Sequence, residues 1–310
     1  MIRRFFFSSM ILFWFSALSQ NQISDILNYE DEVEEVAIGN ERIAFVDMGS
    51  GEKTLVFIHG LSSNLQSWMK NISELKKSHR CIALDLPGYG KSTKNRTTYS
   101  MRDYADFLNS FIDRKNLENV ILAGHSMGGQ IATHTVLNAQ ENFRSLILIA
   151  PAGVETFTEN EAEILKASYT SEMVEGSTPE QIRDNYEKNF YKFPVDAQFM
   201  VEERIAMKEA DNMNIYSKVV VNNIQAMLNE PVIEEFPEIE IPVLMIYGKN
   251  DLLIPNSYFH PSQDVVSLSE TAKEKISNLE VNLIDKAGHF VNFEQSEQVN
   301  NLILEFLNQE

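Results

Sequence analysis

The chain has 310 residues, 44% of them hydrophobic, and a formal net charge of −19 at pH 7. This length can bury a large core and suits one α/β domain or a domain that carries an insertion. The negative charge disfavours nucleic acid as a partner, because binding to phosphates requires a basic face, and it is explained more simply as an aid to solubility.

Residues 1–19 have the features of a secretory signal peptide. Two arginines precede a mostly apolar run from Phe5 to Leu18, and Ala17 and Ser19 are the small residues that a signal peptidase reads. The run covers 14 residues, whereas about 20 span a bilayer comfortably, so an uncleaved signal anchor is the less favoured alternative. We expect an exported protein, periplasmic or secreted, whose mature chain begins near Gln20 and keeps no stable membrane span.

Beyond an acidic lead-in, the chain alternates predicted strands and helices. Two short strands joined by Gly39-Asn40 suit a hairpin, and Ser100 with Asp103 resembles a helix cap. This alternation predicts a mostly parallel central sheet covered by helices on both faces. The expected strands are Val33 to Ile38, Arg42 to Asp47, Thr54 to Ile58, Cys81 to Leu84, Val120 to Ala123 and Leu146 to Ala150, with helices over Gln66 to Lys77 and Ser100 to Arg114.

The alternation stops after Pro151 and resumes only near Pro242. The intervening residues have helical spacing, several glutamates and five methionines, and Val219 to Val221 is the one run there that favours a strand. Strands follow at Pro242 to Tyr247 and Val281 to Ile284, before a terminal helix over Glu297 to Asn308. The sequence therefore predicts a core of residues 20–151 and 237–310 with a helical cap at residues 152–236.

The strand at Val120 ends in a Gly-x-Ser-x-Gly turn, with Ser126 between Gly124 and Gly128. In a nucleophile elbow this spacing turns a strand sharply into a helix and exposes the serine oxygen at the sheet edge. Side chains at the two glycines would collide with a neighbouring strand or with the departing helix. Ser126 is therefore the candidate nucleophile.

A serine hydroxyl needs a base within hydrogen-bond reach and an acid that holds the base. His289 follows the last predicted strand, where a parallel sheet presents loops to a ligand, and Asp251 ends the strand before it. Asp85 and Asp285 also end strands, but Asp85 opens a Pro-Gly turn where a structural role is expected. The order Ser126, Asp251, His289 is the order of an α/β-hydrolase triad.

The oxyanion of an acyl-transfer reaction needs two preorganised N–H donors. Met127 follows the nucleophile and supplies one, and Leu61, in the loop after the strand at Thr54, supplies the other. His59 in the same loop is expected to orient it rather than to act as the base.

Five segments together resemble the successive signature blocks of the α/β-hydrolase superfamily. The resemblance covers about Arg42 to Asn308 apart from the insertion, which corresponds to the cap of that family, and it is strongest to secreted bacterial esterases and lipases. The segments are Phe57-Ile58-His59-Gly60, Asp85 to Ser92, Gly124 to Gly129, Gly248 to Asp251 and Gly288-His289-Phe290.

Differences from related groups narrow the expected reaction. Haloalkane dehalogenases and epoxide hydrolases have aspartate at the position of Ser126, and the loop after His59 lacks the His-Gly-Gly-Pro-Gly pattern of proline iminopeptidases. Carbon–carbon hydrolases of ring-fission products usually have asparagine and tryptophan where this chain has His125 and Phe290. The resemblance thus implies a serine hydrolase that cleaves carboxylic esters, with a carbon–carbon hydrolase or a catalytically silent binding protein as alternatives.

The expected partner is a small ester with an apolar acyl group, and no metal or cofactor is expected. Methionine side chains repack around varied shapes, so those of the insertion suit an adaptable pocket, although most such residues pack a domain's own core. The candidates for this pocket are Met173, Met200, Met207, Met213, Met227, Phe157, Phe190, Phe193 and Phe199. The oligomeric state stays open.

Overall fold

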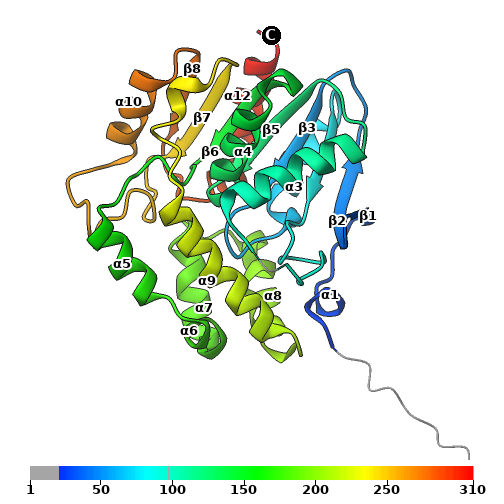
Figure 1. Ribbon diagram of the computed structural model, residues 1–310, viewed down its shortest axis with the longest axis vertical. Helices are drawn as coiled ribbons and strands as arrows, with labels where there is room; N and C mark the ends of the chain where they lie inside the picture. The colour runs from blue at the N-terminus through cyan, green and yellow to red at the C-terminus, as the bar shows by residue number, and fades with distance from the viewer. Residues whose placement is uncertain (1–20, 97, 310) are drawn as a thin grey trace, which may run out of the picture.

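The computed structural model describes residues 21–96 and 98–309, so the predicted signal peptide lies outside the described residues. Eight strands form one sheet in the order β1-β2-β4-β3-β5-β6-β7-β8 (Figure 1). The pairs β1·β2 and β2·β4 are antiparallel, and all the other pairs are parallel. The strands are β1 (Glu34–Ile38), β2 (Glu41–Met48), β3 (Thr54–Ile58), β4 (Arg80–Leu84), β5 (Val120–His125), β6 (Phe143–Ile149), β7 (Val243–Gly248) and β8 (Leu279–Ile284).

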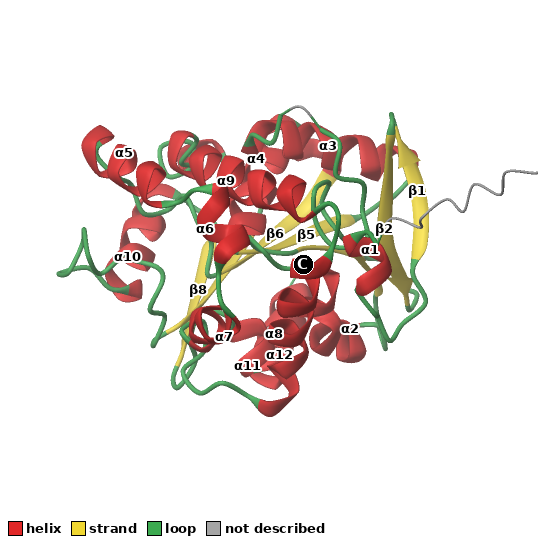
Figure 2. Cartoon of the chain, turned by 90° about the horizontal axis from the view of Figure 1, so that it is seen from below, coloured by secondary structure: helices red, strands yellow, loops and turns green. Residues whose placement is uncertain are grey.

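The expected alternation of strands and helices is confirmed. Every residue of β3, β5 and β7 is buried, as expected for parallel strands whose two faces are both covered. Figure 2 shows helices on both sides of the sheet. Those of the core are α2 (Met69–Leu75), α3 (Met101–Arg114), α4 (Met127–Asn138), α10 (Val265–Lys275), α11 (Val291–Glu294) and α12 (Ser296–Leu307), and a short α1 (Ile23–Ile26) precedes the sheet.

The long segment between β6 and β7 is helical and forms a cap beyond the ends of the parallel strands (Figure 1). The expected strand at Val219 to Val221 is wrong, because these residues lie within α9. Val219 and Val220 are both buried there on a helical face. The cap helices are α5 (Glu159–Ser168), α6 (Ser171–Gly176), α7 (Pro179–Glu187), α8 (Gln198–Ala206) and α9 (Met213–Asn229), with 3₁₀ turns at Val195–Ala197, Met207–Glu209 and Phe236–Glu238.

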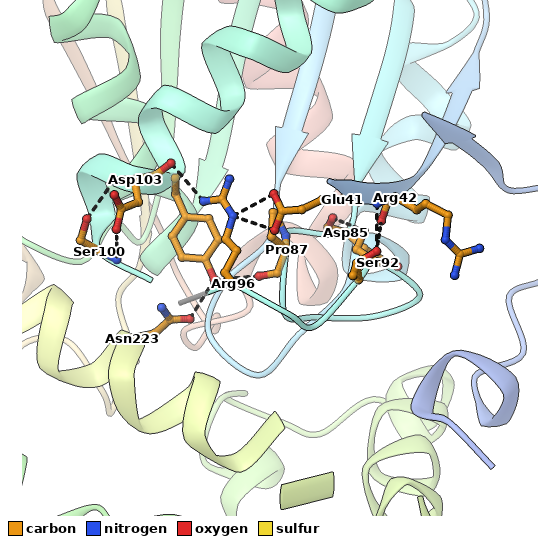
Figure 3. A network of polar contacts seen from close by, with 11 residues as sticks. Glu41, Arg42, Asp85, Pro87, Ser92, Arg96, Ser100, Asp103 and Asn223 are labelled. Carbon is orange, nitrogen blue, oxygen red and sulfur yellow. Dashed lines mark hydrogen bonds and ion pairs between the residues drawn. The ribbon is translucent and has the colours of Figure 1, made fainter. Parts of the chain in front are cut away.

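The loop after β4 connects the core to the cap through polar contacts (Figure 3). Ser92 donates its hydroxyl proton to the carbonyl of Asp85 at 2.6 Å and accepts the N–H of Ala44 at 2.9 Å. From the cap, Asn223 of α9 donates its side-chain amide to the carbonyl of Tyr99, in the same loop, at 2.8 Å, and it accepts the hydroxyl of Tyr104 in α3 at 3.3 Å. The cap therefore rests on a loop that is itself fixed to the sheet.

The long chain segment between Asp251 and His289 is accounted for by α10. Asp264 caps this helix by accepting the N–H of Ser267 at 2.9 Å, and α10 packs on β7 and β8. This part of the segment thus covers β8 at the edge of the sheet. No helix within residues 21–96 and 98–309 is long and apolar enough to cross a membrane.

Candidate active site

Ser126 lies at the tip of the turn between β5 and α4, in a backbone conformation that is rare for a residue with a side chain. Its φ is +54° and its ψ is −120°, a region in which non-glycine residues are strained and which marks functional turns. The turn is held by hydrogen bonds from the Ser126 N–H to Ile149 O at 2.9 Å and from Gly129 N–H to Ser126 O at 2.9 Å. Ser126 is half-buried, whereas the residues on either side of it are buried.

The two glycines of the turn are required by close packing, as the sequence predicts. A Cβ on Gly124 would overlap the carbonyl oxygen of Gly128 in the departing helix. A Cβ on Gly128 would overlap the carbonyl oxygen of Ile58 at the end of β3. The strained turn therefore fits only when both positions lack a side chain.

The structure brings His289 and Asp251 into direct contact. Nδ1 of His289 lies 2.7 Å from Oδ2 of Asp251, and this Asp251 side chain is fully buried. The same carboxylate accepts the N–H groups of Leu253 at 2.8 Å and Ile254 at 3.0 Å through its other oxygen. Since the carboxylate engages Nδ1, it fixes the imidazole so that Nε2 remains available for a proton transfer.

The other two strand-end aspartates have different partners. Asp285 forms an ion pair with Lys249 at 2.9 Å. Asp85 is buried and accepts hydrogen bonds from the N–H groups of Leu65 and Lys91 at 2.8 and 2.7 Å. Asp85 therefore organises the loops around it, which is the structural role expected from its turn.

The loop after β3 packs directly on the serine turn. A Cβ on Gly60 would lie 3.2 Å from Cβ of Ser126 and 3.0 Å from Nδ1 of His125, so a side chain here would force these neighbours to shift slightly. Leu61 follows, and its N–H has no acceptor within the described part of the chain. Met127 is the first residue of α4, where an N–H lacks an intrahelical acceptor.

His59 holds this loop in place. Its Nδ1 donates to the carbonyl of Gly60 at 2.8 Å, and its Nε2 accepts the N–H of Leu86 at 3.1 Å. Burial lowers the pKa of His59, which keeps the ring neutral and both contacts intact. This arrangement is that of an orienting residue, in agreement with the sequence interpretation.

His125 is buried between the serine turn and the base. Its Nε2 lies 3.0 Å from the backbone carbonyl of His289, and a carbonyl can only accept, so Nε2 carries the proton. The ring also packs on those of His289 and Phe290, with centroids 4.9 and 4.6 Å away. His125 thus supports the loop that carries His289, a role that sequence reasoning missed.

A pocket lies between the cap and the loop that follows Gly60. Its apolar lining consists of Leu27, Phe199, Met200 and Met207, with the rings of Tyr186 and Tyr216. Its polar lining consists of Ser62, Ser63, Asn64, Ser67, Gly90, Glu203 and Arg204. The pocket is therefore less apolar than the sequence predicts.

The other candidate pocket residues pack elsewhere. Phe190 stacks on Phe290 with centroids 5.3 Å apart, and Phe193 packs on Phe190. Phe157 packs on His260, and Met173 is 57% exposed. Phe190 and Phe193 thus join the cap to the segment after His289, whereas Met213 and Met227 pack with the main hydrophobic core.

Two charged cap residues that the sequence analysis did not single out border the pocket. Glu203 accepts the side-chain amides of Asn64 at 3.1 Å and Gln66 at 2.7 Å, and burial raises its pKa. Arg204 is buried and donates Nη2 to the carbonyl of Val174 at 2.7 Å, whereas its buried Nη1 has no protein partner among the described residues. No signal in the sequence marks these two residues, because charged residues on a helix usually face solvent.

Within residues 21–96 and 98–309, no group of three or more His, Cys, Asp or Glu side chains is arranged to hold a metal ion. The chemistry that the described residues offer is that of a serine, an imidazole, a carboxylate and backbone N–H donors.

Comparison with known proteins identifies the family of this chain and supports its fold. Residues 53–296 match the family model of the alpha/beta hydrolase fold. The chain is 27% identical over 282 residues to the 2-hydroxy-6-oxononadienedioate/2-hydroxy-6-oxononatrienedioate hydrolase of Paraburkholderia phymatum, covering 86% of this chain and 91% of that protein. It is 25% identical over 267 residues to human monoacylglycerol lipase ABHD6, covering 82% of this chain and 75% of that protein.

A solved structure of a membrane phospholipase A, described as a bacterial virulence factor, superposes with a TM-score of 0.74. It is 26% identical in sequence and covers 90% of this chain and 86% of that chain. The names of these relatives specify different substrates, so the comparisons leave the substrate of this chain open.

Proposed function

This chain belongs to the α/β-hydrolase fold family, and from that premise we propose that it is a serine hydrolase that cleaves carboxylic esters through an acyl-enzyme. The observation that carries the proposal is the Asp251–His289 hydrogen bond in a chain whose Ser126 occupies a strained, glycine-flanked turn. A receptor with the same fold would not need this backbone strain at a half-exposed serine.

In the proposed reaction, Oγ of Ser126 attacks the ester carbonyl carbon while Nε2 of His289 takes the hydroxyl proton. Asp251 holds the imidazole and stabilises its positive charge. The N–H groups of Leu61 and Met127 donate to the oxygen that becomes negative. The proton then passes to the leaving alcohol as its bond to the acyl carbon breaks, and water releases the acid by the same steps.

The activity is tested with chromogenic esters whose acyl chains run from two to ten carbons. Part of the pocket is apolar, and each buried methylene contributes about 0.8 kcal/mol, so kcat/KM should climb severalfold from acetate upward until the pocket is full. A preference for acetate over butyrate and hexanoate would contradict the assignment of this pocket to the acyl chain.

One observation favours a second candidate, a carbon–carbon hydrolase of ring-fission products. The free Nη1 of Arg204 is buried beside the pocket, where a carboxylate would satisfy it, and the name of the Paraburkholderia relative specifies a dioate substrate. Assay of a 2-hydroxy-6-oxo-dienoate beside the ester series separates the two. Faster turnover of the dienoate, lost in Arg204→Met, would replace the esterase proposal.

A further inference from the structure

The N-terminal strap, which we define as residues 21–29, connects the cap to the core on the side of the pocket. Asn21 donates its N–H to the carboxylate of Asp211 at 2.9 Å and accepts the N–H of Asp211 at 2.9 Å. Two residues later, the N–H of Ile23 donates to Oδ1 of Asn212 at 3.0 Å. These contacts join the start of the strap to the cap just before α9.

The far end of the strap is attached to the core. The hydroxyl of Tyr29 donates to Oδ2 of Asp85 at 2.8 Å, and Nζ of Lys91 lies 4.9 Å from the centre of the Tyr29 ring. Burial and the Asp85 carboxylate raise the pKa of Tyr29 well above its ordinary value, so the phenol remains a donor. Since Asp85 also accepts the N–H of Leu65, the strap and the loop beside Ser126 share one anchor.

Between these two anchors, the apolar side chains of the strap face inward. Ile23 is fully buried and Leu27 is 3% exposed. Leu27 lines the pocket together with Met200 and Met207 of the cap and Ser62 of the loop after β3, whereas Ile23 packs in the core without lining the pocket. The pocket is therefore lined by the cap, by the loops after β3 and β4, and by the strap.

We propose that Leu27 is a specificity-determining residue, forming the strap's wall of the pocket and limiting the length of the acyl chain that fits. This inference rests on the proposed ester hydrolysis. Leu27→Ala removes side-chain atoms from the strap's wall of the pocket, and the anchors at Asn21 and Tyr29 hold the backbone of the strap in place. A larger side chain at position 27 reduces the space in the pocket instead.

The test compares Leu27→Ala, Leu27→Phe and the control Ile23→Ala across straight-chain esters. Leu27→Ala should move the preferred acyl chain to longer esters and raise kcat/KM for the first two-carbon extension about tenfold relative to wild type. Leu27→Phe should move it to shorter esters. Ile23→Ala removes a buried side chain from the same strap and should lower the melting temperature without moving the preference.

The same proteins are titrated with straight-chain carboxylic acids by calorimetry, which measures binding to the pocket without any need for turnover. If the wild type hydrolyses no ester, the proposed function fails, but the Leu27 variants should still shift the chain length that binds. An unchanged preference in both Leu27 variants, or an equal shift in Ile23→Ala, would overturn the inference while leaving the esterase proposal standing.

Discussion

His125 is the residue whose chemistry most constrains the site. Its Nε2–H is committed to the carbonyl of His289, and its Nδ1 is buried without a partner in the described structure, close against Gly60. A second proton on the ring would find no acceptor. Burial and the neighbouring His289 therefore lower the pKa of His125 well below its ordinary value.

This lowered pKa predicts a specific loss of stability in acid. The unfolded chain takes up a proton on His125 below about pH 6.5, and the folded chain does not, so the free energy of unfolding falls as the pH drops below that value. His125→Gln keeps an N–H donor for the carbonyl but cannot ionise. Between pH 7 and pH 5.5 it should lose about 1 kcal/mol less than the wild type. Urea unfolding at several pH values measures this, and equal losses would contradict the buried neutral imidazole.

At the scale of elements, the junction of β5 and α4 places the nucleophile because two glycines let three backbone segments meet. Gly124 faces Gly128 of the helix, and Gly128 in turn faces Ile58 of β3. Gly176, at the exposed end of α6, has open space where a Cβ would lie. The two kinds of glycine are thus expected to respond in opposite ways to the same substitution.

Gly124→Ala should lower the free energy of unfolding by about 3 kcal/mol or more and remove activity, since the added methyl group overlaps backbone that cannot move aside. Gly176→Ala, the matched control, should be neutral or stabilise the protein by up to about 1 kcal/mol. Thermal melts and ester turnover of both variants provide the measurement. A folded, active Gly124→Ala protein would show that the turn is less constrained than its packing indicates.

Elements with a strong local pattern were predictable, and those determined by distant partners were not. Buried strands such as Thr54–Ile58 read as continuous apolar runs, and the cap of α3 is visible in Ser100 and Asp103. In contrast, Val219 to Val221 has the β-branched composition of a strand, yet tertiary packing of α9 overrides it. The helix α10 was missed because its mixed composition resembles a loop.

The site likewise has parts that could be predicted from local motifs and parts that could not. Ser126, Asp251, His289, Leu61 and Met127 follow from motifs at strand ends, and the structure joins Asp251 to His289, while their catalytic roles stay predictions. The strap could not be predicted from the sequence. Its helix α1 is only four residues long, and Asp211, the partner of Asn21, lies 190 positions away in the sequence. No local periodicity reports a contact over that separation.

At the scale of the whole molecule, the described chain forms one sheet with a cap, and the strap is one of the segments that join the cap to the core across a long sequence distance. Asn21, the first residue that the structure describes, contacts Asp211 of the cap and lies two positions after the segment that the sequence predicts to be a signal peptide. Cleavage after Ser19 would leave Gln20 in front of the first cap contact. The cap and core would then be joined by the first residues of the mature protein.

We expect the exported protein to begin near Gln20, because the basic head, short apolar run and small residues of the leader suit signal peptidase. N-terminal sequencing of the protein from its native host measures this. A chain that still begins at Met1 would favour the signal anchor.

The central claim, that Ser126 is an acylated nucleophile, is tested most directly by covalent labelling. A phosphonate ester probe should attach one group to the wild type, and mass spectrometry of the digested protein should place it on the peptide that contains Ser126. Ser126→Ala should take up no label and lose about 10³-fold or more in kcat while it melts as the wild type does. An unlabelled wild type, or a Ser126→Ala variant with near-normal turnover, would contradict the account.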